Sequence, residues 1–159
     1  GAATISDFVD GAQELAAATN AAGGYAITVF ESDEMNLVTN TGLDTSTYIP
    51  DTDCNASGCD QTSEEDWTDA NTYNGFGYSL DDPDSDVGTT LFQHDTGGGS
   101  FMARQFPNDD GGESAVEIMS NSSETGSQDC YVCYRMTISS TQQAGTYANT
   151  VNYVASATF

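Results

Sequence analysis

Short hydrophobic segments, rich in β-branched and aromatic residues, recur along the chain between Gly, Asn and Asp. Segments of this kind predict strands, because the side chains of a strand point to opposite faces in turn. Regular short strands with turn signals between them are typical of an all-β antiparallel sandwich, immunoglobulin-like or jelly-roll-like, rather than of an α/β fold. The predicted strands are residues 25–30, 73–80, 89–93, 101–106, 131–138 and 146–159.

Residues 10–18 can be interpreted in two ways. Their sequence, DGAQELAAA, contains good helix formers, so a short helix is allowed on propensity. Leu15, Ala17 and Thr19 also alternate, and a Gly23-Gly24 turn follows, as expected for a strand. Both interpretations stay open at this point.

The last predicted strand, residues 146–159, is unusually long. It must pair on both sides or be covered, because an open strand edge invites pairing with another chain. Long polar loops separate the strands, and loops of this length in an ordered domain usually carry ligands or contacts. These loops are residues 51–70, 81–88, 95–100, 108–113 and 120–128.

The length and net charge of the chain limit the functions that it can have. The 159 residues suit one sandwich domain, residues 1–159, and the aromatic content of 10% argues against disorder. The net charge is −23, with no Lys and only Arg104 and Arg135 as basic residues. Nucleic acids and anionic membranes are excluded as partners, because affinity for phosphate requires Lys and Arg. Repulsion among the carboxylates implies divalent cations or high salt.

The four cysteines form two close pairs, Cys54 with Cys59 and Cys130 with Cys133. An even number in a chain of secreted character predicts disulfides, and acidic neighbours disfavour the alternative of a zinc site. The residues between Cys54 and Cys59 can form a tight turn, whereas Cys130 and Cys133 would face opposite ways in a strand. Local pairing is preferred, with cross-linking between the two pairs as the alternative.

Other features point to an extracellular location. Asn55 and Asn121 begin N-x-[ST] glycosylation motifs in polar surroundings that are interpreted as surface loops. The sequence contains neither a signal peptide nor an apolar run of transmembrane length. We therefore expect a processed, secreted form that does not insert into a membrane.

The sequence gives only weak indications of a catalytic site. The only histidine, His94, lies in a predicted loop, and no serine occurs in a G-x-S-x-G motif. Paired carboxylates mean little in a chain with 25 acidic residues. We therefore expect that the protein is not an enzyme.

The most specific local signal is a predicted calcium loop at Asp82, Asp84 and Asp86. Alternating carboxylates in a turn can converge on one hard cation. Val87 and Gln93 depart from the EF-hand pattern, so calcium is expected here without an EF-hand. Weaker acidic candidates are Asp51, Asp53 and Asp60, and the set Asn108, Asp109, Asp110 and Glu113. Arg104 and Arg135 are each expected to anchor a carboxylate.

Two blocks carry a resemblance. The run YVCYRMTISSTQQAGTYANTVNYVASATF (residues 131–159) resembles the closing strands of secreted β-sandwich surface proteins of candidate-phyla (Patescibacteria) bacteria. ATNAAGGYAITV (residues 18–29) is similar to early strands of such proteins. The resemblance implies export and a cell-surface location, and it supplies no catalytic residues.

These observations favour a structural subunit that polymerises with copies of itself into a pilus-like surface filament or layer. Residues 1–10 could be a donor strand that completes a neighbour's sheet, or an edge strand of their own domain. The residues expected to take part in assembly are Ile5, Phe8, Val9, Tyr153 and Phe159.

The alternative is a calcium-dependent adhesion or carbohydrate-binding module for host-cell or environmental glycans. Aromatic residues in or near the loops would form its binding platform. The first candidates for that platform are Trp67, Tyr73 and Phe76.

Overall fold

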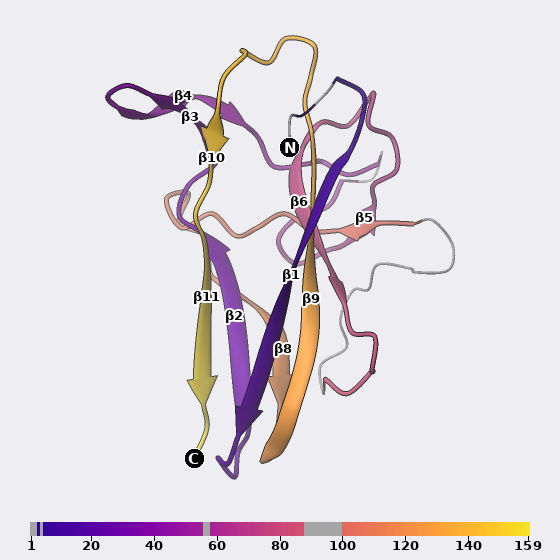
Figure 1. Cartoon of the computed structure of the whole chain (residues 1–159), viewed down its shortest axis with the longest axis vertical. Helices are drawn as coiled ribbons and strands as arrows, with labels where there is room; N and C mark the ends of the chain where they lie inside the picture. The colour runs from indigo at the N-terminus through magenta and orange to yellow at the C-terminus, as the bar shows by residue number, and fades with distance from the viewer. Residues whose placement is uncertain (1–2, 4, 56–57, 88–99) are drawn as a thin grey trace.

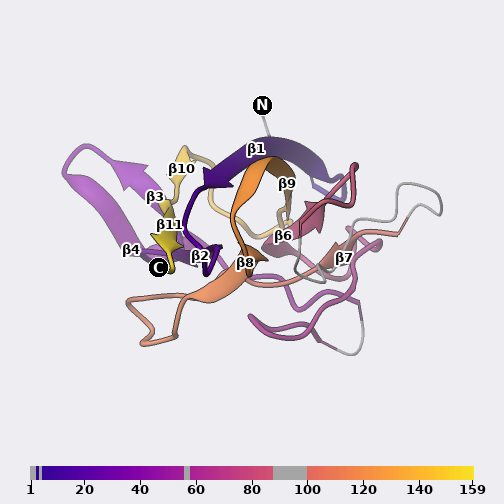
Figure 2. The ribbon, with the colours of Figure 1, turned by 90° about the horizontal axis from the view of Figure 1, so that it is seen from below.

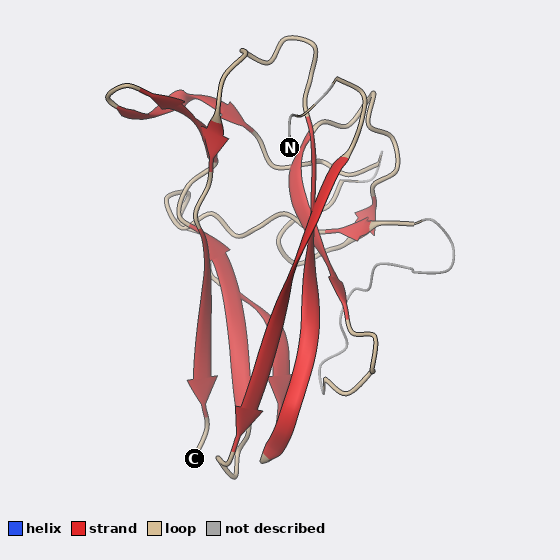
Figure 3. Cartoon of the chain, in the orientation of Figure 1, coloured by secondary structure: helices blue, strands red, loops and turns tan. Residues whose placement is uncertain are grey.

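A computed structural model describes residues 3, 5–55, 58–87 and 100–159, and these residues form strands and loops without a helix (Figure 3). The predicted all-β class is confirmed, while the predicted strand at residues 89–93 lies outside the described ranges. The described strands are β1 (Val9–Thr19), β2 (Tyr25–Glu31), β3 (Met35–Thr39), β4 (Gly42–Ile49), β5 (Glu65–Asp66), β6 (Gly75–Asp81), β7 (Met102–Ala103), β8 (Val116–Asn121), β9 (Thr125–Thr137), β10 (Tyr147–Ala148) and β11 (Val151–Ala157).

Two antiparallel sheets form the body of the molecule, in the orders β1-β9-β6 and β11-β2-β8 (Figures 1 and 2). Alternate residues of β2, beginning with Tyr25 and Ile27, point into the core. They pack together with Leu80 of β6 and Val132 of β9. The core therefore lies between the two sheets, as in a sandwich.

The segment at residues 10–18 is a strand. β1 pairs with β9 from Val9↔Met136 to Thr19↔Thr125. The backbone hydrogen bonds of this long pairing outweigh the intrinsic helix preference of its alanines, which is a weak force by comparison. β1 is an edge strand of its sheet.

A third sheet, β10-β3-β4, extends away from the sandwich (Figure 1). We call its β3–β4 hairpin, residues 35–49, the arm. Sequence patterns did not predict the arm, because Thr, Asn and Ser occupy both of its faces. Leu43, beside the turn, is 55% exposed, and Val38 opposite it is exposed as well.

The long strand predicted at residues 146–159 is interrupted. β10 pairs with β3 of the arm, and β11 pairs with β2 of the sandwich. The chain changes sheets at Asn149 and Thr150, where the Thr150 carbonyl accepts a hydrogen bond from the Ser32 N–H (3.0 Å). One continuous strand could not serve two sheets that diverge in this way.

A smaller cluster lies on the outer side of β6. It contains the Cys54–Cys59 disulfide, Trp67, Phe101 and Ala103, and the short β5-β7 sheet runs beside it. The predicted strand at residues 101–106 is therefore limited to Met102–Ala103.

A segment after β4 crosses β6 at very short range. A Cβ atom on Gly75 would lie 2.7 Å from the Thr52 Cα, and Gly75 has a φ of +142°. Only glycine tolerates this combination of contact and backbone angle. The crossing holds the neighbouring Asp51 against β6.

Candidate functional site

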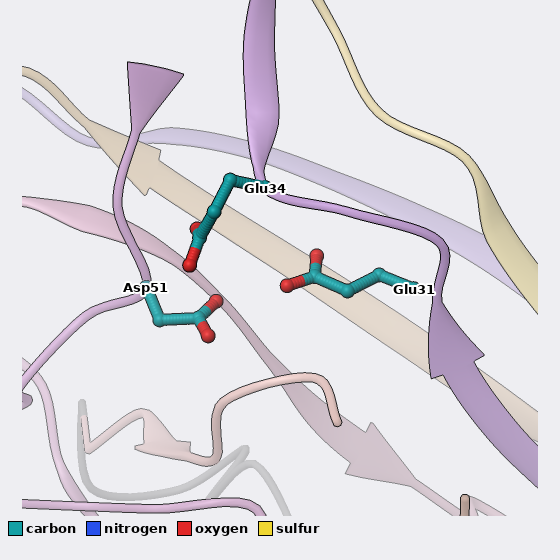
Figure 4. A group of neighbouring side chains, drawn as sticks. All are labelled: Glu31, Glu34 and Asp51. Atoms are coloured by element: carbon teal, nitrogen blue, oxygen red, sulfur yellow. The ribbon is translucent and has the colours of Figure 1, made fainter. Parts of the chain in front are cut away.

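Three carboxylates from separate segments converge where the arm joins the sandwich (Figure 4). Glu31 ends β2, Glu34 lies in the turn before β3, and Asp51 follows β4. One oxygen from each side chain lies within 4.8 Å of the others. We call this set the acidic junction.

Glu31 is the most deeply buried member, with 1% of its surface exposed. Its N–H donates to the Pro107 carbonyl (2.9 Å), and its carbonyl accepts from the Asp109 N–H (3.0 Å). One carboxylate oxygen, Oε2, accepts a hydrogen bond from the Asn149 amide. The other, Oε1, is buried and has no hydrogen-bond partner.

Asp51 and Glu34 are also held by the backbone around them. The residues flanking Asp51 bond to β6, with the Thr52 N–H donating to the Phe76 carbonyl (2.9 Å) and the Phe76 N–H to the Pro50 carbonyl (2.9 Å). The Glu34 carboxylate accepts from the Asn108 side chain and the Asp51 N–H. The Asp51 Oδ1 atom is buried without a partner.

Burial and mutual repulsion make these groups hard to ionise. Burial raises the pKa of Glu31 to about 8, against the opposing hydrogen bond from Asn149. Burial, followed by the negative charges of Glu31 and Glu34, raises the pKa of Asp51 to about 9. Burial raises the pKa of Glu34 as well. Without a cation, the junction therefore retains protons near neutral pH.

The basic side chains of the protein are engaged elsewhere. Arg104 pairs with Glu64 (2.6 Å) and Arg135 with Asp10 (2.8 Å), as expected of two carboxylate anchors. Arg135 also donates to the Trp67 carbonyl (2.9 Å). Neither arginine is therefore available to neutralise the acidic junction, whose oxygen ligands suit a hard cation.

The structure does not bring together the three carboxylates of the expected calcium loop, Asp82, Asp84 and Asp86. The Asp82 carboxylate accepts hydrogen bonds from the N–H groups of Asp86 (3.4 Å) and Val87 (3.1 Å), so it caps its own turn. Asp84 and Asp86 are exposed. Among the described residues, the acidic junction is the group of three whose ligand atoms meet the metal-site distance. Backbone groups of its own loop occupy the Asp82 carboxylate here, and calcium binding by this loop stays a prediction.

The cysteine prediction is half right. Cys54 and Cys59 form the local disulfide, with their Cα atoms 5.5 Å apart. Cys130 and Cys133 are free thiols, so both a bond between them and a cross-link to the first pair are wrong. Both lie within β9, where residues three apart face opposite sides. All four thiols together as a zinc site are likewise ruled out.

Both predicted glycosylation acceptors are engaged in hydrogen bonds. The Asn55 amide donates to Thr68 (3.0 Å), and its motif continues into residues 56–57, outside the described ranges. The Asn121 amide donates to Gln128 (3.2 Å) at the end of β8, rather than lying in a loop. Glycosylation stays a prediction. His94 also lies outside the described residues.

Of the three aromatic residues proposed as a glycan platform, Trp67 and Phe76 are buried and Tyr73 is partly buried. Trp67 is fully buried, and its Nε1–H donates to the Tyr73 carbonyl (2.9 Å). Phe76 is buried in the core, and Tyr73 is half-buried against the smaller cluster. A glycan would have to bind another surface.

The residues predicted to take part in assembly have different environments. Phe8 packs edge-to-face on Trp67, with ring centroids 5.3 Å apart, and Val9 starts β1 within its own sheet. Ile5 bridges to Ile138 and lines a pocket of about 670 Å³. The Tyr153 hydroxyl hydrogen-bonds with that of Tyr134, and Phe159 is 95% exposed.

Sequence reasoning named Asp51 and two neighbours of the junction, Asn108 and Glu113, but it missed Glu31 and Glu34. A signal for Glu31 was present. It follows Tyr25, Ile27 and Val29 at the same alternate spacing, so it occupies a position that faces the core. A charged residue at such a position requires a partner.

Comparison with protein-family models, curated proteins and solved structures finds no match for this chain. In the described part of the chain, no helix is long and apolar enough to cross a membrane. The Cys54–Cys59 disulfide is compatible with a secreted protein.

Proposed function

We propose that this chain is a non-catalytic structural subunit of an extracellular surface assembly, in which copies join by pairing of edge strands. The observation that carries the proposal is β11, an edge strand of its sheet. From Met136 to Phe159 the sequence contains no charged residue, although the net charge of the chain is −23. Copies that approach through this part of the molecule avoid most of their mutual repulsion.

The open edge of β11 can be assigned to particular residues. Thr158 exchanges backbone hydrogen bonds with Gly23 and Gly24 (2.9 Å each), so its polar backbone groups face β2. Because N–H and C=O directions alternate along a strand, those of Ala155 and Ala157 face away from β2. A strand from a second copy can pair there.

The surroundings of β11 leave room for a partner. A groove of about 320 Å³ lies between the β1 and β11 edges, and its lining is uncharged and mostly small: Ala16, Ala17, Ala18, Thr19, Tyr25, Ile27, Ala155, Ser156 and Ala157. Small side chains permit close approach of another backbone. This supports addition of a strand at the seam between the two sheets.

The test compares Ala155→Pro with Ala155→Ser in the full chain. Proline removes the outward N–H of Ala155 without removing a bond to β2, and prolines are tolerated at such edge positions. Serine keeps that N–H. Light scattering and electron microscopy should show assemblies for the native chain and Ala155→Ser, and monomers for Ala155→Pro.

Folding of each variant is checked by circular dichroism. A native chain that stays monomeric at high concentration would overturn the proposed function. Assemblies of Ala155→Pro equal to those of the native chain would exclude β11 as the joining edge.

A further inference from the structure

The acidic junction contains buried oxygens that nothing in the protein satisfies. Glu31 Oε1 and Asp51 Oδ1 have no hydrogen-bond partner. Two amide oxygens, Asn36 Oδ1 and Asn149 Oδ1, are buried without a partner as well. The Asn149 amide contacts Glu31 directly, and Asn36 is only 1% exposed. Buried carboxylate oxygens without a partner, such as Glu31 Oε1 and Asp51 Oδ1, are costly in a folded protein unless a donor or a cation meets them.

The positions of the three carboxylates are set in advance by the backbone. Glu31 is held by its main-chain bonds to Pro107 and Asp109, and Asp51 by the crossing over β6. Glu34 is joined to Asp51 through the Asp51 N–H. The ligands therefore need little rearrangement to meet one ion, which favours binding.

We propose that Glu31, Glu34 and Asp51 bind one Ca²⁺ ion that clamps the arm to the sandwich. Every proposed ligand atom is a carboxylate oxygen, which selects a hard cation over zinc or copper. Three carboxylates can supply three to about six oxygens, and Ca²⁺ accepts six to eight in irregular geometry. Mg²⁺ demands a nearly ideal octahedron and is expected to bind more weakly.

The clamp acts at the two ends of the arm. Glu34 immediately precedes β3, Asp51 follows β4 by one intervening residue, and Glu31 belongs to the sandwich. An ion bound to all three joins both arm strands to the core, and fixes the angle at which the arm projects. This inference does not depend on self-association, because all three ligands come from one copy.

The experiment is a calorimetric titration of CaCl2 into the full chain after removal of metal by a chelator. About 0.5 M NaCl shortens the Debye length to under about 5 Å and suppresses general counterion binding to the acidic surface. Glu31→Gln removes one charged ligand with little change of shape. Asp84→Asn is the matched control, an identical acid-to-amide change in the loop that does not converge.

We expect one saturable site in the native chain and in Asp84→Asn. In Glu31→Gln the affinity should fall roughly 100-fold, because affinity at oxygen sites follows the number of charged ligands. Ca²⁺ should raise the unfolding temperature of the first two proteins only. Glu34→Gln provides the same test if Glu31→Gln does not fold.

Absence of saturable binding in the folded native chain would overturn the inference. Equal affinity in Glu31→Gln, or loss of binding in Asp84→Asn, would overturn it too. The titration is repeated on monomeric Ala155→Pro, so that binding of calcium is judged separately from assembly.

Discussion

The molecule divides into an acidic region and an uncharged one. Every charged residue lies at or before Arg135, and the chain beyond it, which contributes β10 and β11, has none. The arm resembles the second region, since Asp44 is its only charged residue. The two neutral segments pair with each other through β10 and β3.

This difference shows that the net charge of a chain does not tell which part of its surface can bind another copy. The acidic region must manage its repulsion within one copy, by two arginines and, as we propose, by a cation. The uncharged region has no such requirement, and it leaves the β11 edge and an apolar pocket beside Ile138 open to contact. Each region can be tested by a change that disturbs it alone.

The largest effect is expected from Arg135→Ala in the acidic region. The guanidinium lies 4.4 Å from the Phe8 ring centre and 3.9 Å from that of Phe101, and it bonds to Asp10 and the Trp67 carbonyl. Replacement by alanine leaves the buried Trp67 carbonyl without this donor. The unfolding free energy, measured in urea, should fall by about 2–3 kcal/mol.

The matched control is Arg104→Ala, because the Arg104 side chain is 21% exposed against 13% for Arg135. It should cost roughly 0.5–1 kcal/mol, as partly exposed pairs do. Equal costs for the two variants would mean that burial does not distinguish the two arginines.

The stability of the metal-free protein should also depend on pH. The folded-state pKa values of Glu31 (about 8) and Asp51 (about 9) lie above their ordinary values of 4.5 and 3.8. The folded state therefore holds more protons, and the associated stability is complete below about pH 4 and is lost as pH rises through 8 and 9. Between pH 6 and 9 the unfolding free energy should therefore fall as pH rises, because the unfolded state has already released these protons and the folded state still holds them.

Denaturant titrations in the presence of a chelator measure this loss. Glu31→Gln should flatten the pH dependence, because the amide does not ionise. If the unfolding free energy changed with pH equally in the native chain and in Glu31→Gln, a group other than Glu31 would be responsible for the pH dependence.

The smallest effect on stability is expected in the uncharged region. Leu43→Asp changes an exposed side chain of the arm, so the unfolding free energy measured in urea should change by less than about 0.5 kcal/mol. The new charge should nevertheless raise the concentration needed for assembly severalfold, as measured by light scattering. If the concentration needed for assembly did not change, the arm would not take part in the contact between copies, and β11 alone would form it.

The fold was largely predictable where one side of a strand faces the core. Hydrophobic segments between turn residues identified β2, whose alternate residues face the core, and they identified β6 and β9 as well. The arm was missed because it is buried only at its base, at Asn36, Leu37 and Ile49, so its strands carry no hydrophobic period. β1 stayed ambiguous because only its pairing with β9 decides between helix and strand.

The candidate site was harder to predict for a topological reason. Asp82, Asp84 and Asp86 are close in sequence, and local spacing was the only available criterion. Glu31 and Asp51 are 20 positions apart. They meet because β3 and β4 leave the sandwich and return to it, which no spacing rule expresses.

The crossing over Gly75 has a kinetic consequence. Asp51 reaches its place only after the segment that contains it has docked on β6, a strand distant in sequence that itself requires β9. Such nonlocal contacts form late in folding. A calcium ion that needs the finished junction would therefore leave the folding rate unchanged and slow unfolding, so its benefit would appear as a longer lifetime of the native state.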